Sequence, residues 1–169
     1  EKIVLTLHLM ELELDAGPVL LKKEMSINKD TRIGQIYDYL NSEFPSMFVE
    51  VVDGIEKGTI KPEPQPENSF LASRCYPRIP RDSEINWNNS AVRIERLINA
   101  SSEPLSGAYT FIGLIKIYIW RAHYENPKIK FYGTPGQVAE RRPRTGEVVI
   151  VTGEGFIVLQ EIEVENSGR

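Results

Sequence analysis

Two side chains near the start of the sequence are of types that can move protons. His8 lies seven residues before Asp15, and Asp15 is followed directly by Ala16-Gly17-Pro18. A positioned carboxylate can accept a proton from a reacting group or hold a protonated imidazole in place. An aspartate before such a turn also commonly bonds its own backbone, and a lone histidine on a strand is commonly a hydrogen-bonded structural residue. The pair alone therefore leaves a catalytic and a structural role open.

The rest of the sequence holds few other residues of this kind. Cys75 is the only cysteine, and two histidines are too few for a zinc or iron site. No serine has the setting of a nucleophile elbow, and the turn Gly133-Thr134-Pro135-Gly136 lacks the spacing of a phosphate loop. We therefore expect no metal site, and nothing supports covalent catalysis.

The elements around Asp15 are predicted to be two strands. Apolar and polar residues alternate up to Leu9, and from Met10 the apolar positions shift by one. If one face stays buried, the first strand must bulge or bend near Leu9. A turn over residues 15–18 and a second strand over 19–27 follow.

A helix and a proline-rich segment come next. Apolar residues keep helical spacing between residues 33 and 55, which predicts a stripe facing a core. Pro45 divides or kinks this helix, and Gly58 marks its end. Residues 61–67 are too rich in proline for regular structure and are predicted to be an extended connector.

The second half of the sequence has the pattern of a small all-β domain. A short helix is expected at 91–98, capped by Asn89 or Ser90. Glycine turns then separate five short strands, which suggests a barrel; the strands are expected at 109–112, 115–122, 137–140, 148–152 and 156–162. Several aromatic residues could be core or a platform for stacking bases: Trp87, Tyr109, Phe111, Tyr118 and Trp120.

The composition is that of a globular chain. The 169 residues are 41% hydrophobic with a formal net charge of −4. No run reaches the roughly 18 apolar residues of a membrane helix, and the start does not look like a leader peptide, so we expect a cytoplasmic protein without a membrane partner. Acidic side chains outnumber basic ones in residues 1–74, and the cluster Arg141-Arg142-Pro143-Arg144 is typical of a solvated loop.

The order of these weak signals is more specific than any one of them. Nearly the whole chain resembles the rear half of the 10-formyltetrahydrofolate-dependent formyltransferases, through these segments in this order: LHLMELELDAGPVLLKKEMSI, IYDYL, GTIKPEPQ, EINWNNSAVRIERLINA and GEVVIVTGEGFIVLQEIEVE. The resemblance implies an α/β fragment, the end of a nucleotide-fold catalytic domain, followed by a small β-barrel of oligonucleotide-binding-like type. It implies catalytic-domain sequence at 1–60, a connector at 61–77 and the C-terminal barrel domain at 78–169.

The resemblance also implies roles for residues near Asp15. Asp15 matches the family's catalytic aspartate, and the loop residues Glu11, Leu12, Glu13 and Leu14 match the segment that borders the pterin of the folate. His8 and Gly17 are expected to support this site. An amine attacks the formyl carbon, an oxyanion develops and a proton leaves the nitrogen, so a carboxylate is suited to this position.

Several family features are missing from the sequence. No Asn-x-His pair occurs, Asn86 stands where the family commonly has aspartate, and Asn99 stands where it commonly has arginine. The chain begins without methionine, in strand-like residues, so we expect sequence upstream of it and activity in a parent protein rather than in this chain alone.

The implied function is transfer of a formyl group from 10-formyltetrahydrofolate to a primary amine. The acidic charge and the missing arginine favour a nucleotide-linked amino sugar as the acceptor. Initiator Met-tRNA, as in methionyl-tRNA formyltransferase, is the second possibility. A non-catalytic binding module with an oligonucleotide-binding-like barrel is the third.

Overall fold

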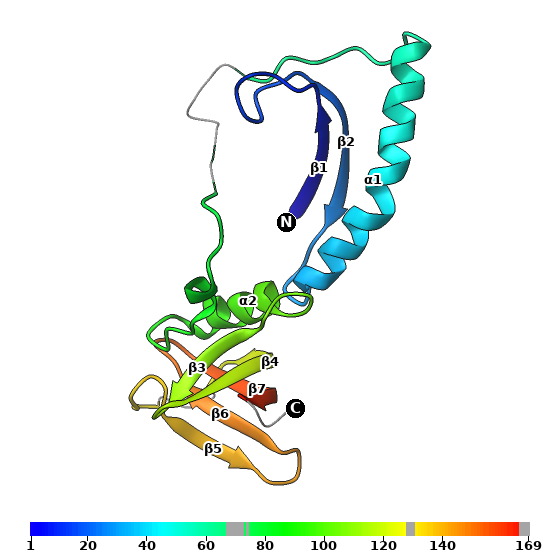
Figure 1. Ribbon diagram of the computed structural model, residues 1–169. Helices are drawn as coiled ribbons and strands as arrows, with labels where there is room; N and C mark the ends of the chain where they lie inside the picture. Colours follow the sequence, from blue (N-terminus) through cyan, green and yellow to red (C-terminus); the bar gives the residue numbers. More distant parts are fainter. Residues whose placement is uncertain (67–72, 74, 128–130, 166–169) are drawn as a thin grey trace. The chain divides into compact units, whose positions relative to one another are not determined.

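The computed structural model describes residues 1–66, 73, 75–127 and 131–165. The chain divides into two compact units, one formed by residues 1–31 and 35–77 and the other by residues 32–34 and 78–169. In chain order (Figure 1) the elements are β1 (Lys2–His8), β2 (Val19–Ser26), α1 (Ile33–Glu56), the 3-10 helix η2 (Pro80–Ser83), α2 (Ala91–Ser101), β3 (Ala108–Ile112), β4 (Ile115–Glu125), β5 (Val138–Arg142), β6 (Glu147–Val151) and β7 (Phe156–Val164). No helix in the described part of the chain has the length and apolar content needed to span a membrane.

The first unit is built from a two-stranded hairpin and the helix α1. β1 and β2 pair antiparallel, and Lys23 on β2 donates to Glu43 on α1 at 2.9 Å. The predicted irregularity is confirmed: the register shifts between Leu7 and His8, which face Leu21 and Val19. The extra residue is Leu20, so the bulge lies in β2 rather than in the first strand.

The condition on which a bend near Leu9 was expected, a buried face that continues past that residue, is not met. β1 ends at His8, and the side chains of Met10, Leu12 and Leu14 are exposed. The backbone of Leu9 still bonds across the hairpin, since its N–H donates to the Pro18 carbonyl at 3.0 Å. Beyond that bond the chain leaves the ladder, so the phase of the apolar residues no longer sets which way they face.

α1 is a single helix that contains Pro45. The predicted buried stripe is only partly present, because Met47, Val51 and Gly54 are buried while Phe44 and Phe48 are exposed. α1 runs beside the hairpin (Figure 1), and apolar side chains elsewhere on its surface stay exposed.

Connector residues 61–66 lie against the start of β2. Val19 and Glu63 exchange two backbone hydrogen bonds, of 2.7 and 2.8 Å, which form an isolated antiparallel bridge. The prediction of an extended connector is confirmed for this stretch, and residues 67–72 and 74 lie outside the described residues.

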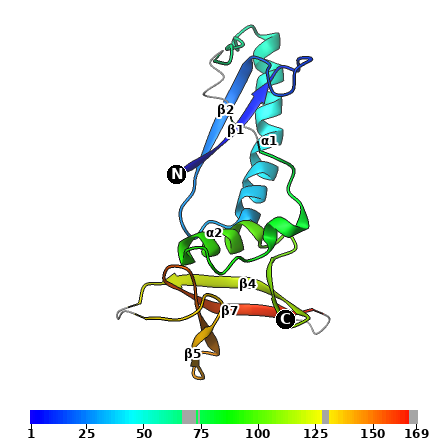
Figure 2. The same ribbon diagram turned by 90° about the vertical axis from the view of Figure 1, so that its left-hand side faces the viewer.

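The second unit is a five-stranded antiparallel sheet covered by α2. The strand order is β3-β4-β7-β6-β5, and the long strands β4 and β7 lie side by side at its centre (Figure 2). α2 packs mainly on β4. Ser90 is its N-cap and accepts the Arg93 backbone N–H at 3.4 Å, which decides between the two predicted caps. The buried core consists of Ile85, Ala91, Ile94, Ile98, Ala108, Ile119, Ala122 and Ile157.

All five predicted strands are present, with bounds within a few residues of those expected. The closed barrel is not confirmed. Among the described residues the end strands β3 and β5 pair only with β4 and β6, so the sheet stays open between them.

Candidate functional site

The candidate site is the loop of residues 9–18 that joins β1 to β2. The loop opens at the register shift and is closed at its base by the bond from the Leu9 N–H to the Pro18 carbonyl. Inside it the Ala16 N–H donates to the Glu13 carbonyl at 3.4 Å, which forms a tight turn around Asp15. The fold therefore places Asp15 near the end of a short loop on a hairpin.

Asp15 has an unusual backbone conformation. Its φ is +58°, and it is the only non-glycine residue with positive φ in the described part of the chain. Aspartate tolerates this left-handed region better than most residues, and strained backbone of this kind often occurs at functional sites.

The side chain of Asp15 is directed at His8. Asp15 Oδ1 lies 3.7 Å from His8 Nε2, and the other ring nitrogen, Nδ1, lies 2.8 Å from the Leu9 carbonyl oxygen. When Nδ1 carries a proton, it donates to Leu9 and holds the ring with Nε2 facing the carboxylate. The structure thus brings together the two residues that the sequence singled out.

The exposure of the two side chains differs. The Asp15 side chain is 82% exposed and that of His8 is 27% exposed. Within the described residues the Asp15 carboxylate makes no hydrogen bond to backbone, so it does not form the backbone-bonded turn of the structural interpretation. Nor does this chain enclose the carboxylate in a cleft, and the catalytic role of Asp15 stays a prediction.

Gly17 lies where the loop passes closest to its own base. A Cβ atom at this position would overlap the carbonyl oxygen of Leu9. Any larger residue would force the two sides of the loop apart, so the glycine is required by close approach. This fits the supporting role expected for Gly17.

The expected pterin-bordering residues all lie in the exposed part of the loop. Leu12 and Leu14 present apolar side chains to solvent, and Glu11 and Glu13 are also exposed. Exposed leucines beside a carboxylate suit the face of a flat ring that carries polar groups at its edge. The residues present therefore fit a folate.

Gln65 belongs to this site and was missed in the sequence. Its side-chain Nε2 donates to the carbonyl oxygens of Asp15, at 2.7 Å, and Gly17, at 2.8 Å. One amide group of the connector thereby holds the backbone on both sides of Ala16. The only sequence signal was its place in the segment GTIKPEPQ, which carries no spacing rule that links it to a loop about 50 residues earlier.

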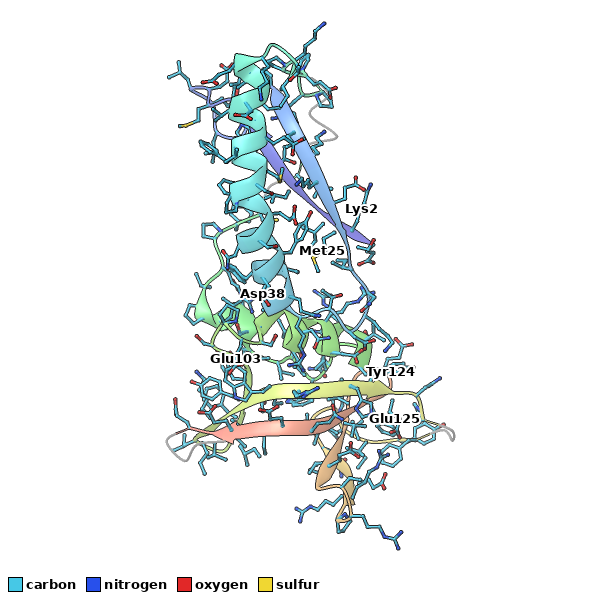
Figure 3. All side chains as sticks on the ribbon, turned by 90° about the vertical axis from the view of Figure 1, so that its right-hand side faces the viewer. Lys2, Met25, Asp38, Glu103, Tyr124 and Glu125 are labelled. Carbon is cyan, nitrogen blue, oxygen red and sulfur yellow. The ribbon has the colours of Figure 1, made fainter. Side chains whose placement is uncertain are left out.

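The arginine cluster is only partly the solvated loop that was expected: Pro143 and Arg144 lie exposed in the turn after β5, whereas Arg141 and Arg142 belong to the strand. Arg141 and Arg142 are the last residues of β5, and Arg142 donates to Glu125, at the end of β4 (Figure 3), at 3.0 and 2.8 Å. Glu140 also accepts from Arg142, and the hydrogen bonds that the guanidinium donates to Glu125 and Glu140 raise its pKa. The charge of Arg142 is therefore balanced by carboxylates rather than presented to a polyanion.

Two other candidates from the sequence can be placed. Asn86, where the family commonly has aspartate, accepts the Asn88 backbone N–H through its Oδ1 at 3.0 Å, a bond that aspartate could also make. Cys75 is free and exposed, and the described residues hold no group of three potential metal ligands.

Comparison with known proteins places the second unit of this chain in one family. The family model described as "Formyl transferase, C-terminal domain" matches residues 79–168, which is more than half of the chain. Methionyl-tRNA formyltransferase from Alkaliphilus metalliredigens (strain QYMF) is 28% identical over 163 residues, which covers 96% of this chain and 50% of that protein. This chain spans about half the length of the curated relatives it matches.

Two solved structures share the fold. An N-formyltransferase from Helicobacter canadensis, in complex with folinic acid and dTDP-3-aminofucose, has a TM-score of 0.69 at 18% identity, and the match covers 96% of this chain and 56% of that one. HypX from Aquifex aeolicus, in complex with tetrahydrofolic acid, has a TM-score of 0.62 at 23% identity, covering 93% of this chain and 26% of that one. Since the family model accounts for most of its residues, this chain belongs to the formyltransferase C-terminal domain family.

Proposed function

We propose that this chain is part of an N-formyltransferase that moves a formyl group from 10-formyltetrahydrofolate to a primary amine. The observation that carries the proposal is the joint match. A single alignment to a named formyltransferase runs through the Asp15 loop as well as the C-terminal domain and covers 96% of the chain. A binding module related to these enzymes only through the C-terminal domain would not also match them over the hairpin, the loop and the connector that precede it.

In this proposal Asp15 is the catalytic residue of the chain. The folate, when bound, supplies the formyl group. The attacking amine loses a proton as it becomes an amide, and the exposed Asp15 carboxylate is free to accept that proton directly or through water. The imidazole of His8, 3.7 Å away, is placed to take up a positive charge beside the carboxylate.

The other residues of the site contact the folate or orient Asp15. Leu12 and Leu14 would lie against the pterin, with Glu11 and Glu13 at its edge. Gly17 and the Gln65 amide fix the loop backbone, so the direction of the Asp15 side chain does not depend on a flexible loop.

We further propose that the parts of the chain have the separate roles expected from the sequence. Residues 1–60 contribute to the catalytic domain, 61–77 connect, and 78–169 form a C-terminal domain of oligonucleotide-binding type. In this view the open five-stranded sheet is a partly closed barrel, a form that this fold class often takes.

For the acceptor, we retain a nucleotide-linked amino sugar as the first candidate. The sequence pI is about 5.3, and the ion pairs of Arg142 reduce the positive charge of the basic cluster. A surface of this kind is poorly suited to a large polyanion. Initiator Met-tRNA is the second candidate, and it is favoured by the names of the curated relatives, which are methionyl-tRNA formyltransferases at 28–29% identity.

The experiment is a formyl-transfer assay on the full-length gene product that contains this chain. The protein is given 10-formyltetrahydrofolate with either a dTDP-linked amino sugar or initiator Met-tRNA, and the formylated product is measured at several salt concentrations. We expect product with the amino sugar and a rate that changes little with salt. Product only with Met-tRNA, with affinity falling steeply as salt rises, would replace the first acceptor by the second. Product with neither, in protein that binds no folate, would overturn the proposed function.

A further inference from the structure

One face of the second unit carries a row of aromatic rings that the core does not use. Tyr109 and Phe111 on β3 and Tyr118 and Trp120 on β4 lie on one face of the sheet, because Tyr109 pairs with Tyr118 and alternate residues point the same way. The neighbouring positions Ala108 and Ile119 belong to the core beneath α2.

These rings contact one another in sequence across the two strands. The centroid of the Tyr109 ring lies 5.7 Å from that of Phe111 and 6.4 Å from that of Tyr118. Tyr118 stacks on Trp120, with 6.4 Å between the ring centroids and an interplanar angle of 26°. Gly107 leaves room for the Trp120 ring to lie close to the backbone, since a Cβ there would lie 3.2 Å from it. The rings therefore form an ordered surface rather than isolated exposed side chains.

A groove of about 420 Å³ opens beside this surface. Its volume lies within the range of small-molecule sites. Its lining combines apolar, aromatic and cationic side chains, among them Arg78, Ile79, Leu105, Tyr109, Lys116 and Tyr118.

The groove holds two cations that contact no carboxylate within the described residues. Lys116 Nζ lies 4.0 Å from the centroid of the Tyr109 ring and 4.7 Å from that of Tyr118, and it forms no ion pair with any residue in the described part of the chain. Arg78 donates to the Ala100 carbonyl and to the hydroxyls of Ser83 and Ser101. All of its acceptors are neutral, so its positive charge is not balanced.

Carboxylates around the groove accept from other donors, and Asp82 accepts the Ile79 backbone N–H at 2.8 Å. Glu84 lies 3.5 Å from the Tyr109 hydroxyl, and Glu163 accepts the Trp120 indole N–H at 2.8 Å. The groove thus pairs flat aromatic faces with unneutralised positive charge, which is the chemistry of a ligand that has a flat ring and an anionic group.

We propose that this groove binds a nucleotide. The base lies against the rings of Tyr109 and Tyr118, and the phosphate lies near Lys116 and Arg78. The long side chain of Lys116 can turn from the ring faces to the phosphate, which uncovers those faces for the base. The nucleotide could be free, as in a nucleotide-linked sugar, or could be the end of an RNA strand. The inference rests on contacts within the second unit and does not depend on formyl transfer.

The test is direct binding to the full 169-residue chain. The chain is titrated with UMP, with uridine, with inorganic phosphate and with a short oligouridylate, by calorimetry and by following the indole N–H signal of Trp120 in NMR spectra. We expect UMP to bind and to shift the Trp120 signal, and uridine and phosphate to bind at least about tenfold more weakly, because each lacks one half of the recognised chemistry.

Two variants and one control make the test specific. Lys116→Met keeps the length of the side chain but removes its charge, and Tyr118→Leu removes a ring. The control Arg93→Met removes one positive charge from the exposed side of α2, outside the groove. Circular dichroism checks that each variant is folded. Each groove variant should weaken UMP binding about tenfold or more, while Arg93→Met should leave it unchanged within about twofold.

The two sources of the nucleotide are separated by the oligouridylate. Equal affinity for UMP and the oligonucleotide supports a free nucleotide, and clearly tighter binding of the oligonucleotide supports a strand end. The proposal is overturned if UMP does not bind the folded chain, if phosphate binds as tightly as UMP, or if Lys116→Met and Arg93→Met weaken binding equally.

Discussion

At the scale of single residues, the loop between β1 and β2 depends on two positions with opposite demands. Asp15 must adopt a left-handed backbone that glycine would adopt more easily, yet it carries a carboxylate directed at His8. Gly17 has an ordinary φ but has no room for a Cβ beside Leu9. Asp15 thus has a strained backbone, and Gly17 is needed because a larger residue would not fit. Such a combination is typical of a loop that orients one side chain.

Gly17 gives a prediction about stability. Gly17→Ala places a methyl group against the Leu9 carbonyl, so the loop must open at its base, and we expect a loss of about 2 kcal/mol in the free energy of unfolding. Gly113→Ala is a reference variant with a different cause of loss: its Cβ position is in open space, but its φ of +61° makes alanine strained there by about 1 kcal/mol. Urea unfolding of the 169-residue chain measures both variants. A loss of less than about 0.5 kcal/mol for Gly17→Ala would show that the close approach is unimportant.

At the scale of elements, the connector acts on the loop from a distance in sequence. The Glu63–Val19 bridge fixes the connector beside β2, and Gln65, two residues on, reaches the carbonyls of Asp15 and Gly17. The proline-rich composition keeps this stretch extended, and this lets Glu63 and Gln65 both face the hairpin.

Gln65→Ala should therefore loosen the loop. It removes two hydrogen bonds, and we expect a loss of about 1–2 kcal/mol in stability and faster amide exchange at Leu9 and Ala16. Gln160→Ala is the control, since Gln160 is exposed on β7 and makes only a 3.5 Å contact with Glu147. Unchanged exchange at Leu9 and Ala16 in Gln65→Ala would mean that the connector does not hold the loop.

The elements also show what could be predicted from the sequence. The five strands of the second unit were found because glycine turns separate runs with strand periodicity, and the cap of α2 was narrowed to two residues because Asn89 and Ser90 are both good N-caps. These signals are local. The alternation of apolar residues at 9–14 did not indicate burial, because it continues in the sequence after the strand pairing has ended at His8. The loop at 11–14 was expected from the family resemblance and not from this periodicity.

Other features could not be found because they depend on tertiary contacts. The hydrogen bonds from Gln65 to the loop join residues that are separated by 50 and 48 positions in the sequence. No sequence pattern indicates such a contact. Whether the sheet closes depends on the relative twist and length of β3 and β5, and strand periodicity does not report either. The meeting of His8 and Asp15 was expected from the family resemblance, and the turn at 13–16 is what brings it about.

At the scale of the whole molecule, the chain carries two candidate sites on two separate units. The loop around Asp15 belongs to the first unit and the aromatic groove belongs to the second. The family match spans the second unit, and the alignment to methionyl-tRNA formyltransferase runs through both. We propose that the first unit carries the chemistry and that the second recognises a nucleotide, so that loss of one function leaves the other measurable.

The most direct test of the account is the rate of formyl transfer by the full-length protein when Asp15 is changed to asparagine. Asp15→Asn keeps the shape of the side chain and removes its ability to take a proton, whereas Asp38→Asn makes the same change to an exposed carboxylate on α1, outside the loop. We expect Asp15→Asn to lower single-turnover formyl transfer by about 10²–10⁴-fold with folate affinity unchanged within about twofold, and Asp38→Asn to keep most of the rate. A near-normal rate for Asp15→Asn would contradict the account and leave Asp15 as a turn residue.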